Sequence, residues 1–387
     1  MREIVVLGAG YAGLTAATSL IGRTRRSRPA GEVRITVVDG NTSFTERLRL
    51  HQLATGQPLA ERPYADLLTG PGVDLVTGEV AAIDMATRTV RLRDGRTLPF
   101  HFLVYGLGSR ADTTGVPGAT ENGHTVDTAA DASRLSRRLR ELDGPATVVV
   151  CGAGLTGVET ATEMAERHPA LAVTLVGDRE PGAALSPRPR AHLRAALDRL
   201  GVRVISGSTV TRVHPGKVEL ADGRTLTADV TVWTAGVRAP GPAGFATDDR
   251  GRIITDEMLR SVSHPEVYAV GDAAAIRQTY GVMHGTCQSG MPTGVQAALN
   301  ISRELAGRPP TRFRYGYLHT AVSLGRHDAV VQFTGPDNSP GRFHLTGRVA
   351  VRYKETVTSS VWPSMARMLR LPGTGRLAWR RGGARTR

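Results

Sequence analysis

Residues 4–13, Ile-Val-Val-Leu-Gly-Ala-Gly-Tyr-Ala-Gly, decide the fold of this chain. A short apolar run rich in β-branched residues leads directly into glycines spaced G-x-G-x-x-G, and the alanine-rich stretch 12–21 follows. This order predicts a buried strand, a tight turn and a helix. A polar, basic loop is expected over 22–31. A second apolar strand over 33–38, closed by Asp39, then completes a β-α-β unit of the usual length.

The glycines of this turn have different physical tasks. Gly8 permits the tight turn, Gly10 lets the backbone approach a bound pyrophosphate, and Gly13 allows the helix to pack closely on the strand. The helix that follows would direct its N-terminal amides at the same phosphate. Asp39 ends the next strand, where a carboxylate can accept hydrogen bonds from an adenosine ribose. A glycine-rich turn can also be a simple connection, but this strand-turn-helix context predicts dinucleotide binding.

The same pattern returns at 146–178. Its parts are a strand over 146–150, the glycines Gly152, Gly154 and Gly157, a helix over 158–167 and a strand over 172–176. An internal repeat of this kind predicts a duplicated nucleotide-binding unit. Short strands over 73–104 are expected to form a meander appended to the first unit, with a hairpin turn at Asp94-Gly95. A matching meander, with a turn at Asp222-Gly223, is expected in the second half.

The second unit does not reveal which nicotinamide nucleotide it binds. Gly177 occupies the position that corresponds to Asp39, and Asp178 and Arg179 come next. Neither the acidic signature of NAD nor a clean basic signature of NADP is therefore present. We expect Asp178 at the nucleotide site and leave both NADH and NADPH open.

Composition limits the remaining function classes. A chain of 387 residues is long enough for two or three domains. No apolar run reaches the roughly 18 residues of a membrane span, so we expect a cytoplasmic protein without integral membrane association. The net charge of +14 comes mostly from scattered arginines, and only 376–387 is densely basic, so specific nucleic-acid binding is not expected. Cys151 and Cys287 form no C-x-x-C pair, and no metal site is predicted, so redox chemistry would need an organic cofactor.

Further motifs carry a family resemblance. They are Val267–Asp272, Leu103–Ser109, Thr231–Gly236, Arg47–Gly56 and Ser323–Val330. Together with the two glycine turns, they resemble flavoproteins with two dinucleotide-binding domains, which have the pyridine nucleotide-disulfide oxidoreductase fold. The chain is most similar to the type II NADH dehydrogenases and their soluble relatives, over residues 1 to about 335. The resemblance implies that the first unit binds FAD and the second binds NADH or NADPH.

The resemblance also implies roles for individual residues. Asp272, after Gly271, would contact the ribityl chain of FAD, and the stretch that begins at Arg47 would wrap toward the flavin. Gly108 and Gly236 end the strands by which such chains cross between domains.

Glu159 matches a family glutamate near the nicotinamide, although stabilisation of the helix N-terminus is an equal alternative. His51 and His284 could be acid–base groups beside a flavin, but a hydrogen-bonded structural role is more common for a loop histidine. Cys287 could lie near the flavin, yet a lone buried cysteine usually behaves as a small hydrophobic residue.

The chain departs from the family in three ways. The quinone-site motif A-Q-x-A-x-Q aligns with 294–299, where Val295 and Leu299 replace both glutamines. The long apolar C-terminus of the type II dehydrogenases is represented only by Ser359–Leu371, which we expect to dock on the core of the protein. No cysteine pair lies near the flavin region, unlike in the disulfide reductases.

We therefore expect an α/β protein with two Rossmann-like domains, the second inserted into the first. The expected limits are 1–117 and 238–300 for FAD, 118–237 for NAD(P), and 301–387 for a C-terminal segment. The expected reaction passes a hydride from NAD(P)H through FAD to a small soluble acceptor, such as a quinone-type molecule, an organic oxidant or oxygen. One rival is an FAD-dependent oxidase or dehydrogenase of a small metabolite, with a vestigial NAD(P) domain. A second rival is a non-enzymatic flavoprotein that relays electrons or senses redox state. The sequence does not indicate the oligomeric state.

Overall fold

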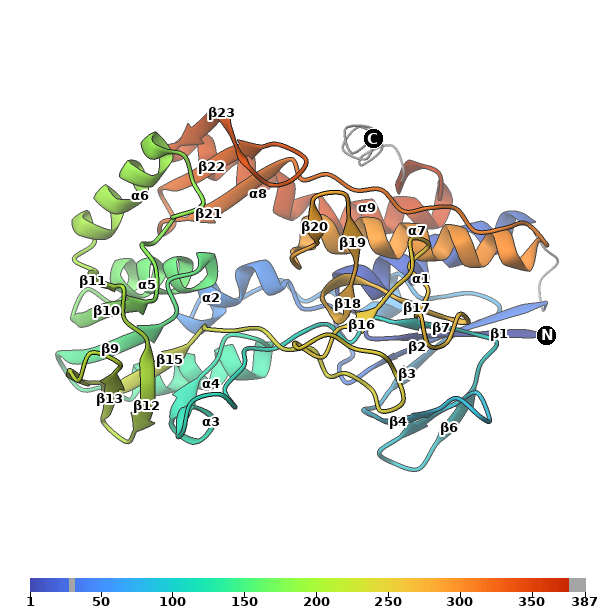
Figure 1. Ribbon diagram of the computed structural model, residues 1–387, viewed down its shortest axis with the longest axis horizontal. Helices are drawn as coiled ribbons and strands as arrows, with labels where there is room; N and C mark the ends of the chain where they lie inside the picture. The colour runs from blue at the N-terminus through green and yellow to red at the C-terminus, as the bar shows by residue number, and fades with distance from the viewer. Residues whose placement is uncertain (28–31, 376–387) are drawn as a thin grey trace.

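The computed structural model describes residues 1–27 and 32–375 and contains two parallel sheets (Figure 1). The first has the order β17-β7-β1-β2-β3, and all of its neighbours pair in parallel. Its strands are β1 (Arg2–Leu7), β2 (Val33–Asp39), β3 (Val73–Thr77), β7 (Phe102–Tyr105) and β17 (Val267–Ala269). Helices α1 (Tyr11–Ser27) and α7 (Cys287–Leu305) pack on each other beside this sheet. The strand order and the helix after β1 define the expected Rossmann unit.

The second sheet repeats this design with the order β11-β10-β9-β15-β8. Its strands are β8 (Gly123–His124), β9 (Ala146–Cys151), β10 (Leu171–Gly177), β11 (Arg203–Ser206) and β15 (Val230–Trp233). Its helices are α3 (Ala119–Asn122), α4 (Ala129–Arg140), α5 (Leu155–Arg167) and α6 (Pro187–Arg199). The chain leaves the first sheet after β7 and returns to it at β17, so the second unit is inserted into the first. We propose domain limits near residues 117, 237 and 300.

Each unit carries a small antiparallel sheet. The strands are β4 (Val80–Asp84), β5 (Thr89–Leu92) and β6 (Thr97–Pro99) in the first, and β12 (Val210–His214), β13 (Lys217–Leu220) and β14 (Thr225–Thr227) in the second. Both predicted hairpin turns are confirmed. Gly95 and Gly223 adopt φ angles of +89° and +85°, which glycine tolerates better than any other residue.

Three local expectations were wrong. Helix α1 continues to Ser27, so residues 22–27 are helical and do not belong to a loop. The helix extends because its last turn has tertiary partners: Arg25 and Arg26 donate to the carbonyls of Thr69 and Arg370. Helix α5 begins at Leu155, directly after the glycine turn, and not at Val158. Strand β3, which we expected in the antiparallel meander, instead pairs in parallel with β2.

The C-terminal segment joins both halves of the molecule. An antiparallel sheet of β21 (His319–Ser323), β22 (Ala329–Thr334) and β23 (Pro340–Thr346) packs against α5 and α6 of the second unit. Helices α8 (Gly347–Ser359) and α9 (Val361–Arg370) then lead back to α1, as Figure 1 shows. Short elements complete the described chain: α2 (Leu50–Ala54), β16 (Ile253–Ile254), β18 (Ala274–Ala275), β19 (Arg277–Gln278), β20 (Gly281–Val282) and single 3₁₀ turns at 47–49, 64–66 and 271–273.

The expected docking of the C-terminal helix is confirmed. Val361, Met365 and Met368 of α9 are buried against the first unit. Trp362 lies 5.9 Å from Phe44, measured between ring centroids. No helix in residues 1–27 and 32–375 is long and apolar enough to cross a membrane. The basic stretch 376–387 lies outside the described residues.

Helices α1 and α7 approach each other so closely that only glycine fits at one contact. A Cβ added at Gly294 would lie 2.2 Å from the carbonyl oxygen of Ala12 and 3.0 Å from the amide nitrogen of Ala16. Gly294 thus belongs to the helix interface, although the sequence alone marked it only as part of a motif.

Replacing Gly294 with valine should lower the free energy of unfolding by about 1–3 kcal/mol, because the helices must separate to admit the side chain. Thermal unfolding followed by circular dichroism would measure this as a lower midpoint temperature. Gly115→Ala is the matched control, since no described atom lies within 4 Å of its Cβ position. An unchanged midpoint for Gly294→Val would show that the interface yields more easily than the structure implies.

Candidate functional site

The first glycine turn leaves open space only at its middle glycine. A Cβ added at Gly8, whose φ is +84°, would lie 2.4 Å from the carbonyl oxygen of Gly106. A Cβ at Gly13 would lie 1.8 Å from the carbonyl oxygen of Gly8. At Gly10, no described atom lies within 4 Å of the Cβ position. The outer glycines are thus required by backbone packing, while Gly10 faces the space in front of α1 where a pyrophosphate would bind.

The second glycine turn has the same geometry. Gly152 has a φ of +114°, and a Cβ there would lie 2.8 Å from the amide nitrogen of Ala235. A Cβ at Gly157 would lie 1.8 Å from the carbonyl oxygen of Gly152. No described atom lies within 4 Å of the Cβ position of Gly154. Both turns therefore form equivalent cradles at the N-termini of α1 and α5.

Asp39 lies at the end of β2, beside the first cradle. Its Oδ2 accepts a hydrogen bond from the amide of Ala9 at 2.7 Å, and its Oδ1 accepts one from the amide of Asn41 at 2.8 Å. These bonds fix the carboxylate next to the turn. A carboxylate at this position can also accept hydrogen bonds from ribose hydroxyls, and the position of Asp39 fits that predicted role.

Asp272 comes from a distant part of the sequence and meets the segment that follows β7 out of the first sheet. Ser109 Oγ donates to Asp272 Oδ2 at 2.9 Å. The carboxylate lies against Gly285, where an added Cβ would fall 2.1 Å from Asp272 Oδ1. A pocket opens here, and Gly271, Asp272 and His284 contribute to its lining. The carboxylate of Asp272 and its close contact with Gly285 therefore fit the predicted binding of the ribityl chain of FAD.

Arg47 and Gly108 lie at the same crossing. Arg47 Nη1 donates to the carbonyl of Ser109 at 2.6 Å, and its Nη2 lies 3.1 Å from Asp127 Oδ1. Gly108 has a φ of +71° and open space at its Cβ position. In this structure Arg47 orders the crossing segment, and its contact with FAD stays a prediction.

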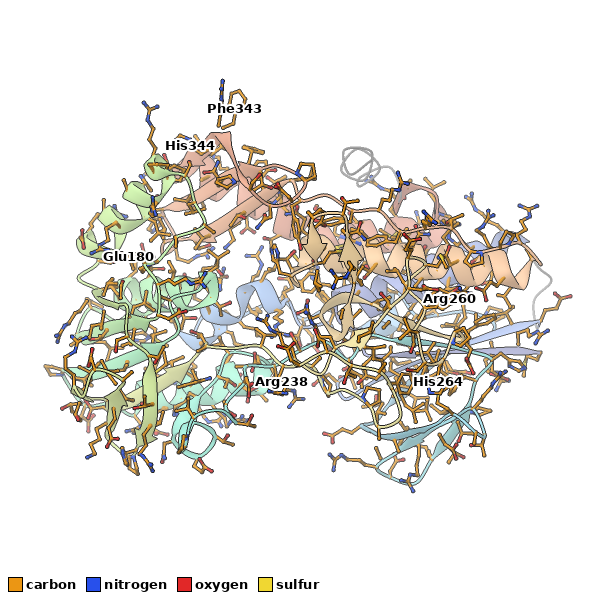
Figure 2. All side chains as sticks on the ribbon, viewed as in Figure 1. Glu180, Arg238, Arg260, His264, Phe343 and His344 are labelled. Carbon is orange, nitrogen blue, oxygen red and sulfur yellow. The ribbon has the colours of Figure 1, made fainter. Side chains whose placement is uncertain are left out.

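The return crossing holds the remaining predicted glycine. Gly236 has a φ of +70°, and its Cβ position lies 3.0 Å from the Cβ of Asp112. Asp112 also forms an ion pair with Arg238 at 3.1 Å, and Figure 2 shows Arg238 where the two halves of the molecule meet. Asp178 is exposed at the end of β10, 3.7 Å from Arg179.

Glu159 lies in a buried polar cluster that joins three parts of the chain. Its Oε1 accepts hydrogen bonds from Lys354 Nζ on α8 and from the amide of Ser323 on β21, the latter at 2.9 Å. Its Oε2 lies 3.8 Å from Nδ1 of His51 on α2. The side chains of Glu159 and Lys354 are 14% and 15% exposed, so the ion pair is largely shielded from water. A surface pocket borders Lys354, and Arg326 contributes to its lining.

The electrostatics of this cluster favour an ionised carboxylate. Burial by itself would raise the pKa of Glu159, but the charge of Lys354 and the hydrogen bonds from Lys354 and Ser323 outweigh it and lower that pKa. Burial lowers the pKa of His51 to about 4, so its imidazole is neutral at physiological pH. Its Nε2 is buried and has no hydrogen-bond partner among the described residues. The sequence offered two roles for Glu159, a place near the nicotinamide and stabilisation of the helix N-terminus. The structure adds a third role, because Glu159 anchors the C-terminal segment.

Lys354 and Ser323 were missed as site residues by the sequence reasoning. One signal was available, because Lys217 and Lys354 are the only two lysines among 49 basic residues. Lys217 is exposed on β13, whereas Lys354 is paired inside the protein. The scarcity of lysine therefore narrowed the choice to two positions, and only the structure separated the buried lysine from the exposed one.

His284 and Cys287 lie beside the Asp272 pocket without forming a charged site. The ring of His284 stacks on Tyr317 with centroids 4.3 Å apart, and burial lowers its pKa. Burial raises the pKa of the Cys287 thiol to about 12, so the thiol stays protonated. Within residues 1–27 and 32–375, no group of three or more His, Cys, Asp or Glu could hold a metal ion.

Two Rossmann units with open phosphate cradles define a class, the oxidoreductases that hold FAD in one unit and a nicotinamide nucleotide in the other. The family model described as "Pyridine nucleotide-disulphide oxidoreductase" matches residues 2–299. The chain belongs to this family. It is therefore an enzyme that uses FAD and NAD(P)H, and the non-enzymatic alternative is not supported.

Individual relatives support this placement. An NADH dehydrogenase-like protein of Mycobacterium tuberculosis is 36% identical over 357 residues, covering 85% of this chain and 87% of the relative. A type II NADH:quinone oxidoreductase of Staphylococcus aureus is 29% identical, covering 85% and 89%.

Solved structures show the same fold. The sulfide:quinone oxidoreductase of Aquifex aeolicus has a TM-score of 0.80 at 18% identity, covering 98% of this chain and 94% of that one. The NDH2 of Plasmodium falciparum in complex with NADH has a TM-score of 0.77 at 13% identity, covering 97% and 98%.

Valine substitutions at Gly10 and Gly154 should separate the two nucleotide sites. Both positions face open space, so the fold should persist while the pyrophosphate is blocked. Gly10→Val should purify without flavin absorbance, whereas Gly154→Val should keep its flavin and lose reduction by NADH and NADPH. Absorbance spectra and anaerobic mixing would measure both effects, and each variant is the control for the other. Full flavin content in Gly10→Val would refute the assignment of the first cradle.

Replacing Lys354 with methionine should destabilise the protein by about 3 kcal/mol at neutral pH, because Glu159 would remain buried without its cation. In the wild type, Glu159 has a lower pKa in the folded protein than in the unfolded chain. It therefore adds to the free energy of unfolding at pH values above its pKa in the unfolded chain, and this contribution is lost as the pH falls through its pKa in the folded protein. In Lys354→Met, burial should instead raise the pKa of Glu159 in the folded protein. The loss of unfolding free energy relative to the wild type should therefore shrink as the pH is lowered from 8 to 5. Chemical denaturation across this range would test it, with Lys354→Met/Glu159→Gln as the control that restores stability. A deficit independent of pH would contradict the pairing.

Proposed function

We propose that this enzyme takes a hydride from NADH or NADPH and passes the electrons through FAD to a small, water-soluble acceptor in the cytoplasm. The second glycine turn supports NADH or NADPH as the electron donor, because its packing and its open middle position match those of the first turn. A metabolite oxidase with a vestigial second unit would not need this open cradle. The intact geometry therefore favours a nicotinamide donor.

The chain positions its cofactors and handles protons. Bound FAD supplies the redox centre, which accepts a hydride equivalent and later gives up two electrons. Asp39 and Asp272 would hold the ribose and ribityl portions, and the turn at Gly10 would hold the pyrophosphate. All three positions flank the first sheet, so one rigid element orients the whole cofactor.

Lys354 and Glu159 would manage the proton that accompanies reduction of an organic acceptor. A two-electron reduction by NAD(P)H consumes one proton from the protein or solvent besides the transferred hydride. Lys354 Nζ bears a proton in a largely buried place, with Glu159 Oε1 and Ser323 Oγ as acceptors, the latter at 2.5 Å. The neutral ring of His51 contacts the same carboxylate. This arrangement can hold a proton at Lys354 and direct it without exposing the site to bulk water.

The acceptor is proposed from the residues at the aligned quinone motif. Val295 and Leu299 are 2% and 9% exposed and offer no polar group. Gln296 Nε2 is already engaged by the carbonyl of Thr311 at 3.0 Å. A quinone carbonyl would thus lack side-chain partners that are each worth about 1 kcal/mol net.

The C-terminal helix adds to this argument. Gly375 lies against Val295, where an added Cβ would fall 2.9 Å from its Cγ2, and Met368 is buried nearby. The segment that could deliver a lipid quinone instead packs over Val295. This difference from the quinone oxidoreductases supports a small acceptor that arrives from water.

The reduced enzyme should be reoxidised faster by oxygen or a short-chain quinone than by menaquinone held in vesicles, because no apolar platform would collect the lipid. Stopped-flow measurement of flavin absorbance would compare the three acceptors, at low and high salt to separate weak electrostatic adsorption. Fast reoxidation by vesicle-held menaquinone alone, persisting at high salt, would overturn this proposal and indicate a respiratory role.

A further inference from the structure

Gly177 occupies the ribose position of the second unit. In the first unit Leu7 pairs with Val38, and Asp39 follows. In the second unit Cys151 pairs with Val176, and Gly177 follows. The register of the two sheets therefore places Gly177 where the first unit has its carboxylate.

An acidic side chain cannot occupy this position in the present packing. A Cβ added at Gly177 would lie 2.4 Å from the Cβ of Ala153 and 2.9 Å from its amide nitrogen. Ala153 belongs to the glycine turn itself, so it cannot move without disturbing the cradle. Position 177 thus supplies no carboxylate to bind both ribose hydroxyls, and none to repel a 2′-phosphate.

Arg179, two residues after Gly177, has a guanidinium group that can reach a phosphate. The side chain of Arg179 is 82% exposed, and its ion pair with Asp178 spans 3.7 Å between exposed groups. An ion pair between exposed groups contributes little free energy in water. The guanidinium of Arg179 can therefore exchange Asp178 for another anion at little cost in free energy. Glu180 is instead paired with Arg194 of α6, and Figure 2 shows Glu180 between α6 and the second sheet. The nearest acidic competitor on that side is therefore already neutralised.

The neighbouring strand adds an unused hydroxyl. Ser206 ends β11 in register with Gly177. Its Oγ is buried and has no hydrogen-bond partner among the described residues. A hydroxyl can donate to a phosphate oxygen or bond to a ribose hydroxyl, whichever the nucleotide presents.

We propose that the second unit accepts NADPH at least as well as NADH, and that Arg179 is the residue that binds the 2′-phosphate. This inference rests on the proposed function, because it assigns the donor of that same site. The planar guanidinium can donate two parallel hydrogen bonds to a phosphate. Asp178, adjacent in sequence, opposes this binding and limits its strength.

Anaerobic flavin reduction by each nucleotide would test the inference in the flavin-bound protein. The second-order rate constant with NADPH should equal or exceed that with NADH. Arg179→Ala should lower the NADPH value by about tenfold, as expected for a lost charge-assisted contact, and leave the NADH value unchanged. Asp178→Asn should raise the NADPH value. Arg203→Ala is the matched control, since Arg203 is exposed at the opposite end of β11 and should affect neither nucleotide.

Two further measurements keep the inference separate from the proposed function. Calorimetry with 2′,5′-ADP and with 5′-AMP needs no electron transfer, and the wild type should bind 2′,5′-ADP more tightly while Arg179→Ala should not. The double variant Ala153→Gly/Gly177→Asp, which removes the closest contact of an added Cβ at position 177, that with the Cβ of Ala153, should shift the preference to NADH. Faster reduction by NADH in the wild type, or equal losses for both nucleotides in Arg179→Ala, would overturn the inference. If neither nucleotide reduces the flavin, the proposed function fails, and 2′,5′-ADP binding still decides the nucleotide preference.

Discussion

The architecture depends on the close approach of helix to strand at the two glycine turns. In each unit the third glycine of the motif packs its Cα against the carbonyl oxygen of the first, where any Cβ would lie 1.8 Å away. This contact places the N-terminus of the helix directly over the end of the first strand. The orphan amides and the positive end of the helix dipole then face the same open space. Everything that a dinucleotide needs at its pyrophosphate follows from this one steric constraint.

The same tight packing spreads outward from the first turn. Ala12 lies within contact range of the Cβ positions of Gly271 and Gly294, so the Gly-Asp segment and α7 both close on the start of α1. Asp272 thereby reaches Ser109, which lies in the segment that follows β7 out of the sheet. Residues from three distant parts of the sequence form one site because small residues let their backbones converge.

The C-terminal segment is held by electrostatics on one side and by apolar packing on the other. Lys354 and Ser323 bind Glu159 of the second unit, while Met365 and Met368 pack on the first. A buried ion pair is costly to form, so its value lies more in geometry than in net stability. By linking α8 to α5, the pair fixes the part of the chain that borders the proposed nicotinamide site. The C-terminal segment is therefore structural for both halves, and in the proposed function it also contributes a polar group to the site.

The sequence by itself determined the two Rossmann units and both hairpin turns, because each depends on local steric rules that glycine, aspartate and apolar runs display directly. The insertion of the second unit was expected from the resemblance to the flavoprotein family. It also identified Asp39, Asp272 and Glu159 as candidates. Only the tertiary structure decided the continuation of α1 past Gly22, the place of β3 in the parallel sheet and the partners of Glu159. Those features depend on contacts between residues far apart in the chain, such as Arg26 with Arg370 and Glu159 with Lys354. The exclusion of a carboxylate at position 177 also depends on a contact between separate segments, because the side chain in the way belongs to Ala153 of the glycine turn. No local pattern encodes such a contact, because it arises only when both segments fold against each other.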